Sequence, residues 1–203
     1  MFGLELLKNY NYSQEKQKQK LEQIYGAAKR LERLINDLLN MALLESGKLR
    51  LKRKKTEIIG IIQSSISNFE PIAAQKNQSF LSQFPKTSSP IVSVDANLIH
   101  RIIDNLLSNA IKFSPKNSQI IVNLEIINSG DYKIQVIDSG PGVPETIQQK
   151  IFEKYEIGTT MLDTSQIGLG LAFCKMAVEA HNGEITVINN QPQGAIFEIT
   201  LPI

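Results

Sequence analysis

Two asparagines and a lysine at helical spacing, Asn105, Asn109 and Lys112, are the residues of this chain best suited to bind a charged ligand. Residues three and four positions apart lie on one face of a helix, so two amide oxygens and an ammonium group would lie in line. Mg²⁺ prefers oxygen ligands, and triphosphate oxygens need a cation to offset their charge. If the pattern stood alone, solvated asparagines on an exposed helix face would be the better interpretation.

Three further motifs follow in order along the chain. In Asp138-Ser-Gly-Pro-Gly142, an acid closes a predicted strand, and the glycines let the backbone pass close to a planar ligand. A carboxylate in an apolar pocket can accept the amino hydrogens of adenine, whereas the alternative is an ordinary turn. The next motif is Phe152-Glu-Lys-Tyr155, whose aromatic residues could equally be ordinary core residues. The last is Gly168-Leu-Gly-Leu171, which precedes a predicted helix whose free N–H groups could bind phosphates.

The order and spacing of these motifs resemble the asparagine, first-glycine, phenylalanine and second-glycine boxes of the sensor histidine kinases. The resemblance covers roughly residues 31–203 and implies the Bergerat ATP-binding fold that DNA gyrase shares. It implies that ATP and Mg²⁺ are the cofactors, with Asn109 as the metal ligand and Asp138 as the adenine-specifying residue. The site residues it implies are Asn105, Asn109, Lys112, Asp138, Gly140, Gly142, Phe152, Tyr155, Gly168, Gly170 and Leu171.

Two positions depart from related patterns. The resemblance implies that the ATP-hydrolysing relatives have a glutamate where this chain has Asn105. That glutamate would act as a base and take a proton from the attacking water, which the amide of Asn105 cannot do. We therefore expect slow hydrolysis, which favours a kinase over an ATPase. The arginine often found after the phenylalanine box is replaced by Ile157, which leaves Lys154 as the nearest cation and leaves open which lid residue contacts the γ-phosphate.

Residues 14–46 read as one long helix that ends at Gly47, with an N-cap at Ser13. Apolar residues recur at alternating steps of three and four at Leu21, Ile24, Ala28, Leu31, Ile35, Leu38 and Ala42. Because a lone helix cannot bury such a stripe, the pattern predicts a bundle, with Phe2, Leu6 and Tyr10 on a partner helix. Residues 1–47 would form a partial helical dimerisation segment, and the chain would form a homodimer through the helix at 14–46. The alternative to a homodimer is that this helix packs within one chain.

Residues 48–203 read as the catalytic ATP-binding domain. We expect an α+β fold in which a helical hairpin is followed by a two-layer sandwich, a mixed sheet covered by helices on one face. The sequence predicts a strand at Leu49–Leu51 and an N-cap at Asp95. The expected helices are 57–74, 97–113, 144–152 and 168–181, and the expected strands are 79–84, 90–94, 119–127, 132–138, 184–189 and 194–201.

The core stripes predicted for the two long helices of this domain share helical spacing. They are Ile58, Ile62, Ile66, Phe69 and Ala73 in the first, and Leu98, Ile102, Leu106, Ala110 and Phe113 in the second.

Composition limits the function classes. The net charge is +2, and positions 48–55 hold six basic residues and no acid. Such a run can bind nucleic acid or a membrane surface, but at its start leucines alternate with basic residues. This alternation indicates a strand with one solvated face instead. The single cysteine, Cys174, suits a reducing cytosol and is expected to be buried. No apolar run reaches the roughly 18 residues that span a bilayer, and residues 1–8 lack a signal-peptide pattern, so we expect a cytoplasmic protein.

A histidine kinase needs a phosphoacceptor histidine followed by an acidic residue and a proline, and neither histidine fits. His100 is spaced to pair with Asp104, and His181 is expected in the last turn of a helix, where the helix dipole stabilises its charge. We infer that the chain begins a few residues after the histidine box, and natural loss is the alternative. The leading function is a kinase that serves a response regulator. The alternatives are a nucleotide-sensing dimerisation module and a serine kinase of the anti-sigma type, which normally lacks the long helix.

Overall fold

The computed structural model describes residues 14–48, 50–85, 91–127, 130–154 and 168–202. The chain divides into two compact units, residues 1–42 and 43–203. The proposed cap at Ser13 and the proposed partner residues Phe2, Leu6 and Tyr10 lie outside the described residues.

The first unit is made by the long helix α2, Gln14–Glu45, as the heptad pattern predicts. The apolar stripe stays largely outside any core, with Leu31 59% exposed and Ile35 56% exposed. The last residue of the helix is Glu45, and Gly47 closes it with a φ of +62°, donating its amide to Leu44 O, while Lys48 N donates to Leu43 O. Glycine reaches this left-handed conformation without strain, so the predicted end of the helix is confirmed.

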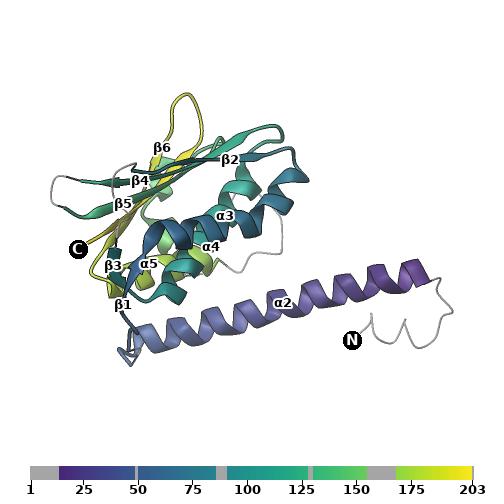
Figure 1. Cartoon of the computed structure of the whole chain (residues 1–203), viewed down its shortest axis with the longest axis horizontal. Coiled ribbons are helices and arrows are strands. Elements are labelled where there is room, and N and C mark those ends of the chain that lie inside the picture. Colours follow the sequence, from purple (N-terminus) through teal and green to yellow (C-terminus); the bar gives the residue numbers. More distant parts are fainter. Residues whose placement is uncertain (1–13, 49, 86–90, 128–129, 155–167, 203) are drawn as a thin grey trace. The chain divides into compact units, whose positions relative to one another are not determined.

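The second unit is α+β, and in the described residues its helices lie on one face of a mixed sheet (Figure 1). Its helices are α3 (Ile58–Ala74), α4 (Ala96–Phe113) and α5 (Gly170–Ala180), and its single-turn 3₁₀ helices are η1 (Glu145–Ile147) and η2 (Lys150–Phe152). Its strands are β1 (Lys54–Glu57), β2 (Ser79–Gln83), β3 (Ile91–Val94), β4 (Gln119–Ile126), β5 (Tyr132–Ile137), β6 (Glu184–Asn189) and β7 (Ala195–Leu201).

The main sheet has the strand order β2-β4-β5-β7-β6, and a separate pair joins β1 to β3. Among the described strands of the main sheet, β2 and β4 run parallel and the other neighbouring pairs run antiparallel, so the predicted mixed sheet is confirmed. The predicted hairpin between β4 and β5 is also present, with Ile126 opposite Tyr132 next to the turn.

Helix α4 is the centre of the core, because it packs against both α3 and α5. Its predicted stripe from Leu98 to Ala110 is buried, and Ile99, Ile103, Leu107 and Ile111 beside it are buried as well. Phe113 differs from the prediction, because it is half-buried at the end of the helix, where the Lys112 ammonium lies 5.2 Å from its ring centroid. A helix covered on two sides needs this wider apolar surface.

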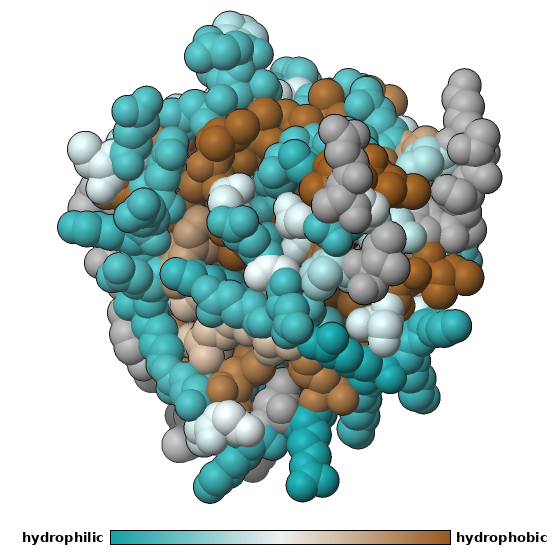
Figure 2. Space-filling view, turned by 90° about the vertical axis from the view of Figure 1, so that its left-hand side faces the viewer, coloured by the Kyte–Doolittle hydropathy of each residue, from teal (hydrophilic) through white to brown (hydrophobic). Residues whose placement is uncertain are grey.

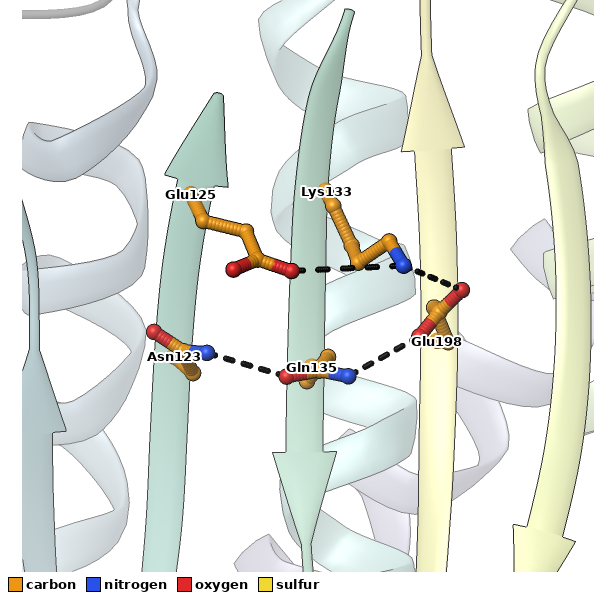
Figure 3. A network of polar contacts seen from close by, with 5 residues as sticks. All are labelled: Asn123, Glu125, Lys133, Gln135 and Glu198. Atoms are coloured by element: carbon orange, nitrogen blue, oxygen red, sulfur yellow. Dashed lines mark hydrogen bonds and ion pairs between the residues drawn. The ribbon is translucent and has the colours of Figure 1, made fainter. Parts of the chain in front are cut away.

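The face of the sheet opposite the helices carries polar side chains that are linked across strands (Figure 3). Asn123 donates to Gln135 at 2.9 Å, and Gln135 donates to Glu198 at 2.8 Å. Lys133 pairs with Glu198 at 3.1 Å. Alternate residues of these strands point inward to the core, which is the period of two that a half-buried sheet requires. On the face of the molecule that Figure 2 shows, hydrophilic residues predominate and apolar areas lie between them.

The strand predicted at Leu49–Leu51 is wrong, because the first strand of this unit is Lys54–Glu57. Position 49 lies outside the described residues, and 50–53 have no regular structure. Side-chain contacts hold this segment instead of a ladder: Lys52 N donates to Asp95 Oδ2 at 2.9 Å, and Arg53 Nη2 donates to Ala180 O at 2.8 Å. The basic side chains of the run are exposed, as expected.

The helix predicted near 144–152 is also wrong in kind, because two separate 3₁₀ turns occupy this stretch. Each is closed by an i→i+3 bond, from Ile147 N to Pro144 O and from Glu153 N to Lys150 O. A segment of nine residues is too short to form a stable α-helix from local bonds alone.

Candidate functional site

Helix α4 carries the asparagine motif, and both of its ends are fixed by side chains. Asp95 caps the start, as predicted, with Oδ1 accepting from Asn97 N at 3.2 Å and Leu98 N at 3.4 Å. At the other end, Lys76 Nζ donates to Ile111 O at 2.8 Å and Lys112 O at 3.2 Å, so a cation lies at the negative end of the helix. The asparagine motif is therefore held on a rigid element.

Asn105, Asn109 and Lys112 lie on one face of α4 and are half-buried. Asn105 Nδ2 lies 3.5 Å from Gly170 O. A Cβ on Gly170 would lie 3.5 Å from Asn105 Oδ1, so the first residue of α5 packs directly against this amide. Asn109 makes no hydrogen bond with its side chain to any residue in the described part of the chain. The second-glycine motif is thus joined to the asparagine motif through Asn105.

Asp138 follows the last residue of β5 and is only 5% exposed. Its Oδ1 accepts from Gly140 N at 2.7 Å and from Ala195 N at 3.1 Å. Burial raises the pKa of this carboxyl, and the two amide bonds oppose that rise. With Oδ1 occupied by two donors, the orientation of the carboxylate is fixed and Oδ2 remains for other partners.

The glycines after Asp138 are required by close contacts. A Cβ on Gly140 would lie 3.0 Å from Phe113 O and 2.9 Å from Asp138 Oδ1. Gly142 has a φ of +78°, and a Cβ there would lie 2.7 Å from Asn189 Oδ1. Residues 138–143, called here the first-glycine loop, therefore pass between α4 and the β6–β7 turn with no space for side chains at these two positions.

The end of α4 also contacts the first-glycine loop directly. Ser139 N donates to Ser114 Oγ at 3.4 Å, and Ser114 is itself buried. Asn105 at one point of α4 and Ser114 at its end thus bring three of the predicted motifs together on a single helix.

The phenylalanine motif and the second-glycine motif meet at α5. Phe152 is buried on η2, and η2 packs against α5. Gly168 has a φ of +68°, and Gly170 and Leu171 are the first two residues of α5, whose N–H groups have no helical partner. Tyr155 and Ile157 lie outside the described residues, as does the rest of the predicted lid, 156–167. Lys154 forms an ion pair with Glu45.

The two histidines differ in their surroundings. His100 Nδ1 lies 3.3 Å from Asp104 Oδ2, which confirms the predicted pair, and 3.4 Å from Ser65 Oγ. His181 lies one residue beyond the last turn of α5, in which the sequence predicts it, and it is not held as a cation. Its Nε2 accepts from Asp95 N at 3.0 Å, and burial lowers its pKa, so this imidazole is neutral and donates from Nδ1 to Ala177 O.

Several residues that shape the site carry no signal in the sequence. Lys76, Gln78 and Ser114 fix the end of α4, and Asn189 and Gln193 contact the first-glycine loop from the β6–β7 turn. Single polar residues in turns are too common to be singled out without the fold. Within the described residues, no group of three or more His, Cys, Asp or Glu side chains could hold a metal ion. None of the described helices has the length and apolar character needed to cross a membrane.

Comparison with protein families gives two matches that together cover most of the chain. Residues 94–203 match the family described as histidine kinase-, DNA gyrase B-, and HSP90-like ATPase. Residues 1–47 match the histidine kinase A phospho-acceptor domain. These 47 residues contain no histidine.

Curated relatives resemble the chain over nearly its whole length. The sensor protein KdpD of Clostridium acetobutylicum is 35% identical over 205 residues, which cover 97% of this chain and 22% of that protein. KdpD of Escherichia coli K12 is 34% identical over 84% of this chain and 18% of that protein. The adaptive-response sensory kinase SasA of Synechocystis is 30% identical, and the match covers 98% of this chain and 53% of that protein. The chain thus spans between about a fifth and about half of these relatives.

Solved structures, including that of a sensor histidine kinase, are also similar to this chain. A crystal structure of full-length ShkA in complex with AMPPNP has a TM-score of 0.78 and 25% identity, and covers 97% of this chain and 41% of that one. The mycobacterial sensor histidine kinase MprB has a TM-score of 0.65 and 26% identity, and covers 74% of this chain and 97% of that one.

Proposed function

Because the chain belongs to the histidine kinase-, DNA gyrase B- and HSP90-like ATPase family, and has the two-domain organisation of the sensor histidine kinases, we propose that it transfers the γ-phosphoryl group of ATP to a histidine. A response regulator would then take the phosphoryl group from that histidine. We assign residues 1–47 to the dimerisation segment and 48–203 to the ATP-binding domain. The protein would act in the cytoplasm as a homodimer formed through residues 14–46.

The environment of Asp138 carries this proposal. Two amides hold Oδ1 of a buried carboxylate, so Oδ2 can accept a hydrogen from the adenine amino group in a fixed direction. Gly140 and Gly142 keep the wall of the pocket close to the plane of the base. Recognition of a 6-amino group by an acceptor selects adenine over guanine, because guanine carries an acceptor at that position.

The phosphates would lie between α4 and the start of α5. Lys112 supplies a positive charge, and the amides of Gly170 and Leu171 are donors at a helix N-terminus. Gly168 gives the backbone the turn that leads into this helix, and Phe152 with Tyr155 would support the base of the lid. Asn105 lies beside Gly170 and fixes the distance between the two helices.

The residues present also fit Mg²⁺. Asn109 carries an amide oxygen on the same face of α4 as Lys112, and its side chain has no other hydrogen-bond partner among the described residues. Mg²⁺ usually takes one or two protein ligands and completes its shell with phosphate oxygens and water, so a site without a carboxylate cluster is suitable. Asn109 would hold the ion, which would supply positive charge to offset that of the phosphates.

We place the phosphoacceptor histidine outside these 203 residues. His181 uses both ring nitrogens in hydrogen bonds and is 2% exposed, so neither nitrogen can attack a phosphoryl group. His100 lies on α4 beside Asp104, in the domain that binds the nucleotide. The absence of a histidine from residues 1–47 is also the observation that favours a second candidate, a nucleotide-sensing dimerisation module without kinase activity.

The decisive experiment supplies a histidine-bearing dimerisation domain of this family, in trans or fused upstream, and follows acid-labile labelling from γ-labelled ATP. The chain alone should give no stable label, and the added histidine should restore it. Lys112→Ala should abolish labelling with the fold intact, whereas Lys116→Ala, an exposed lysine just after α4, should label normally. If the chain binds ATP but never labels the added histidine, the nucleotide-sensing module is the better account.

Nucleotide binding is tested separately by calorimetry. Asp138→Ala should weaken ATP and ADP equally, because both carry adenine, and Asn109→Ala should remove the part of the affinity that depends on Mg²⁺. A roughly tenfold or greater loss is expected for Asp138→Ala, since a hydrogen bond to a charged group is lost from a buried site. Unchanged affinity in either variant would remove that residue from the site.

A further inference from the structure

The β6–β7 turn lies against the first-glycine loop, although none of the four motifs includes it. Asn189 Oδ1, at the end of β6, accepts a hydrogen bond from Val143 N at 2.8 Å. Gln193 Nε2, on the other side of the turn, donates to Ser139 O at 3.2 Å. The partners are backbone groups of fixed type, so the amide of Asn189 must point its oxygen, and that of Gln193 its nitrogen, at the loop.

The backbone of the turn is equally close to the loop. Gly194 has a φ of +115°, and a Cβ on it would lie 1.9 Å from Asp138 O. Asp138 N donates to Ala195 O at 2.9 Å, and Ala195 N donates to Asp138 Oδ1 at 3.1 Å. One of the two amides that fix the Asp138 carboxylate is therefore that of Ala195, the first residue of β7, directly after this turn.

These contacts hold the loop at both ends. Gln193 bonds the residue just after Asp138, and Asn189 bonds the residue just after Gly142. Ser114 holds Ser139 from the opposite side, on α4. Glycine-rich segments have the largest conformational entropy to lose, so a loop with glycines at 140 and 142 keeps a single shape only if its ends are tied.

We infer that the β6–β7 turn is a positioning element of the nucleotide site, in which Asn189 and Gln193 fix the first-glycine loop so that Asp138 presents Oδ2 to the base. This inference deepens the proposed function and rests on it. In this role both side chains act through the loop backbone to which they are bonded. Their loss should therefore weaken binding and also reduce the preference for adenine over guanine.

The test uses two substitutions that each add one negative charge to the same turn. Asn189→Asp keeps the acceptor for Val143 N, whereas Gln193→Glu removes the donor to Ser139 O. Affinities for Mg-ATP and Mg-GTP are measured by calorimetry at 0.3 M salt, where surface charges are screened beyond a few ångströms. Asn189→Asp should stay within about twofold of the wild type, and Gln193→Glu and Asn189→Ala should each bind ATP about fivefold more weakly, the size expected for one neutral hydrogen bond.

Thermal unfolding without nucleotide serves as the second readout, and Asn190→Ala as the matched control. Among the described residues, the Asn190 side chain bonds Gln191 N alone, within the turn, so its loss should leave the ATP to GTP ratio unchanged. Equal losses in Asn189→Asp and Gln193→Glu would overturn the inference, as would wild-type ATP to GTP ratios in Gln193→Glu and Asn189→Ala. If the wild-type chain binds no ATP at all, the proposed function itself fails, which is a different result.

Discussion

The backbone amide of Asp95 donates a hydrogen bond to Nε2 of His181, with the two nitrogens 3.0 Å apart. Asp95 caps the start of α4, and His181 caps the end of α5, so this bond fixes one end of each helix against the other. Asn105 and Gly170 join the same two helices elsewhere along their lengths. The helix that carries the asparagine motif and the helix that begins at the second-glycine motif are thus held together at two points.

This bond predicts how stability depends on pH. The pKa of His181 is lowered in the folded protein, mainly by burial, so the unfolded chain binds more protons once the pH falls below about 6.5. The stability that the neutral imidazole contributes is complete above that pH, and is lost as the pH falls towards the lowered folded value. Urea unfolding of the wild type should show this loss between pH 7 and 5, and His181→Gln should show a smaller dependence on pH. Identical slopes in the two proteins would contradict the prediction.

Cys174 should be chemically inert in the folded protein. The side chain is fully buried, and burial raises the pKa of its thiol to about 12. Because the thiolate is the reactive form, iodoacetamide at pH 8 should label the folded protein very slowly and label it quickly in guanidinium chloride. Rapid labelling under native conditions would mean that α5 opens away from α4.

Two glycine substitutions should have opposite effects on stability. Gly194→Ala places a Cβ against Asp138 O at a φ that L-residues rarely adopt, and should destabilise the protein by about 2 kcal/mol or more. Gly60→Ala lies within α3 with nothing within 4 Å of its Cβ, and should stabilise it by about 0.5–1 kcal/mol. Chemical unfolding of both variants would measure the difference, and a tolerated Gly194→Ala would show that the β6–β7 turn can shift.

Much of the second unit could be predicted because its elements have strong periodicity. Helices α3 and α4 and the hairpin of β4 and β5 follow from apolar spacing and from turn residues. The four motifs indicated which residues would meet, and three of them do meet at α4. The sequence could not show that residues 50–53 are held by Asp95 and Ala180 rather than in a strand, because such contacts join residues more than 40 positions apart.

The sequence also could not show the charge state of His181. A histidine at the end of a helix is usually stabilised as a cation, and only the packing against Asp95 shows that this one is buried and neutral. The same is true of the β6–β7 turn, whose polar residues are ordinary until β6 and β7 place them beside Asp138.

Dimerisation through α2 is tested on its exposed apolar stripe. Leu31 and Ile35 are each more than half exposed within the chain, so a second copy can bury them. Ile35→Glu should shift sedimentation towards the monomer and leave the unfolding of the second unit unchanged, and Lys29→Glu on the same helix should have a smaller effect. A wild-type protein that is monomeric at high concentration would exclude this interface.

Asn105 gives the sharpest test of why this site should transfer phosphate rather than hydrolyse ATP. Its amide lies beside Gly170 and cannot act as a base. Asn105→Glu puts a carboxylate on the same face of α4 as Asn109 and should raise slow ATP hydrolysis about tenfold, without improving the labelling of an added histidine.

Asn105→Ala provides the comparison, because it removes the contact with Gly170 O and adds no base. Both variants should bind ATP more weakly than the wild type, since neither can donate to that carbonyl, but only Asn105→Glu should release phosphate above background. Phosphate release and ATP affinity are measured on the same preparations, so a loss of binding is separated from a loss of chemistry. If Asn105→Glu, at ATP concentrations that saturate it, still releases phosphate at the background rate, the residue at this position does not decide between transfer and hydrolysis.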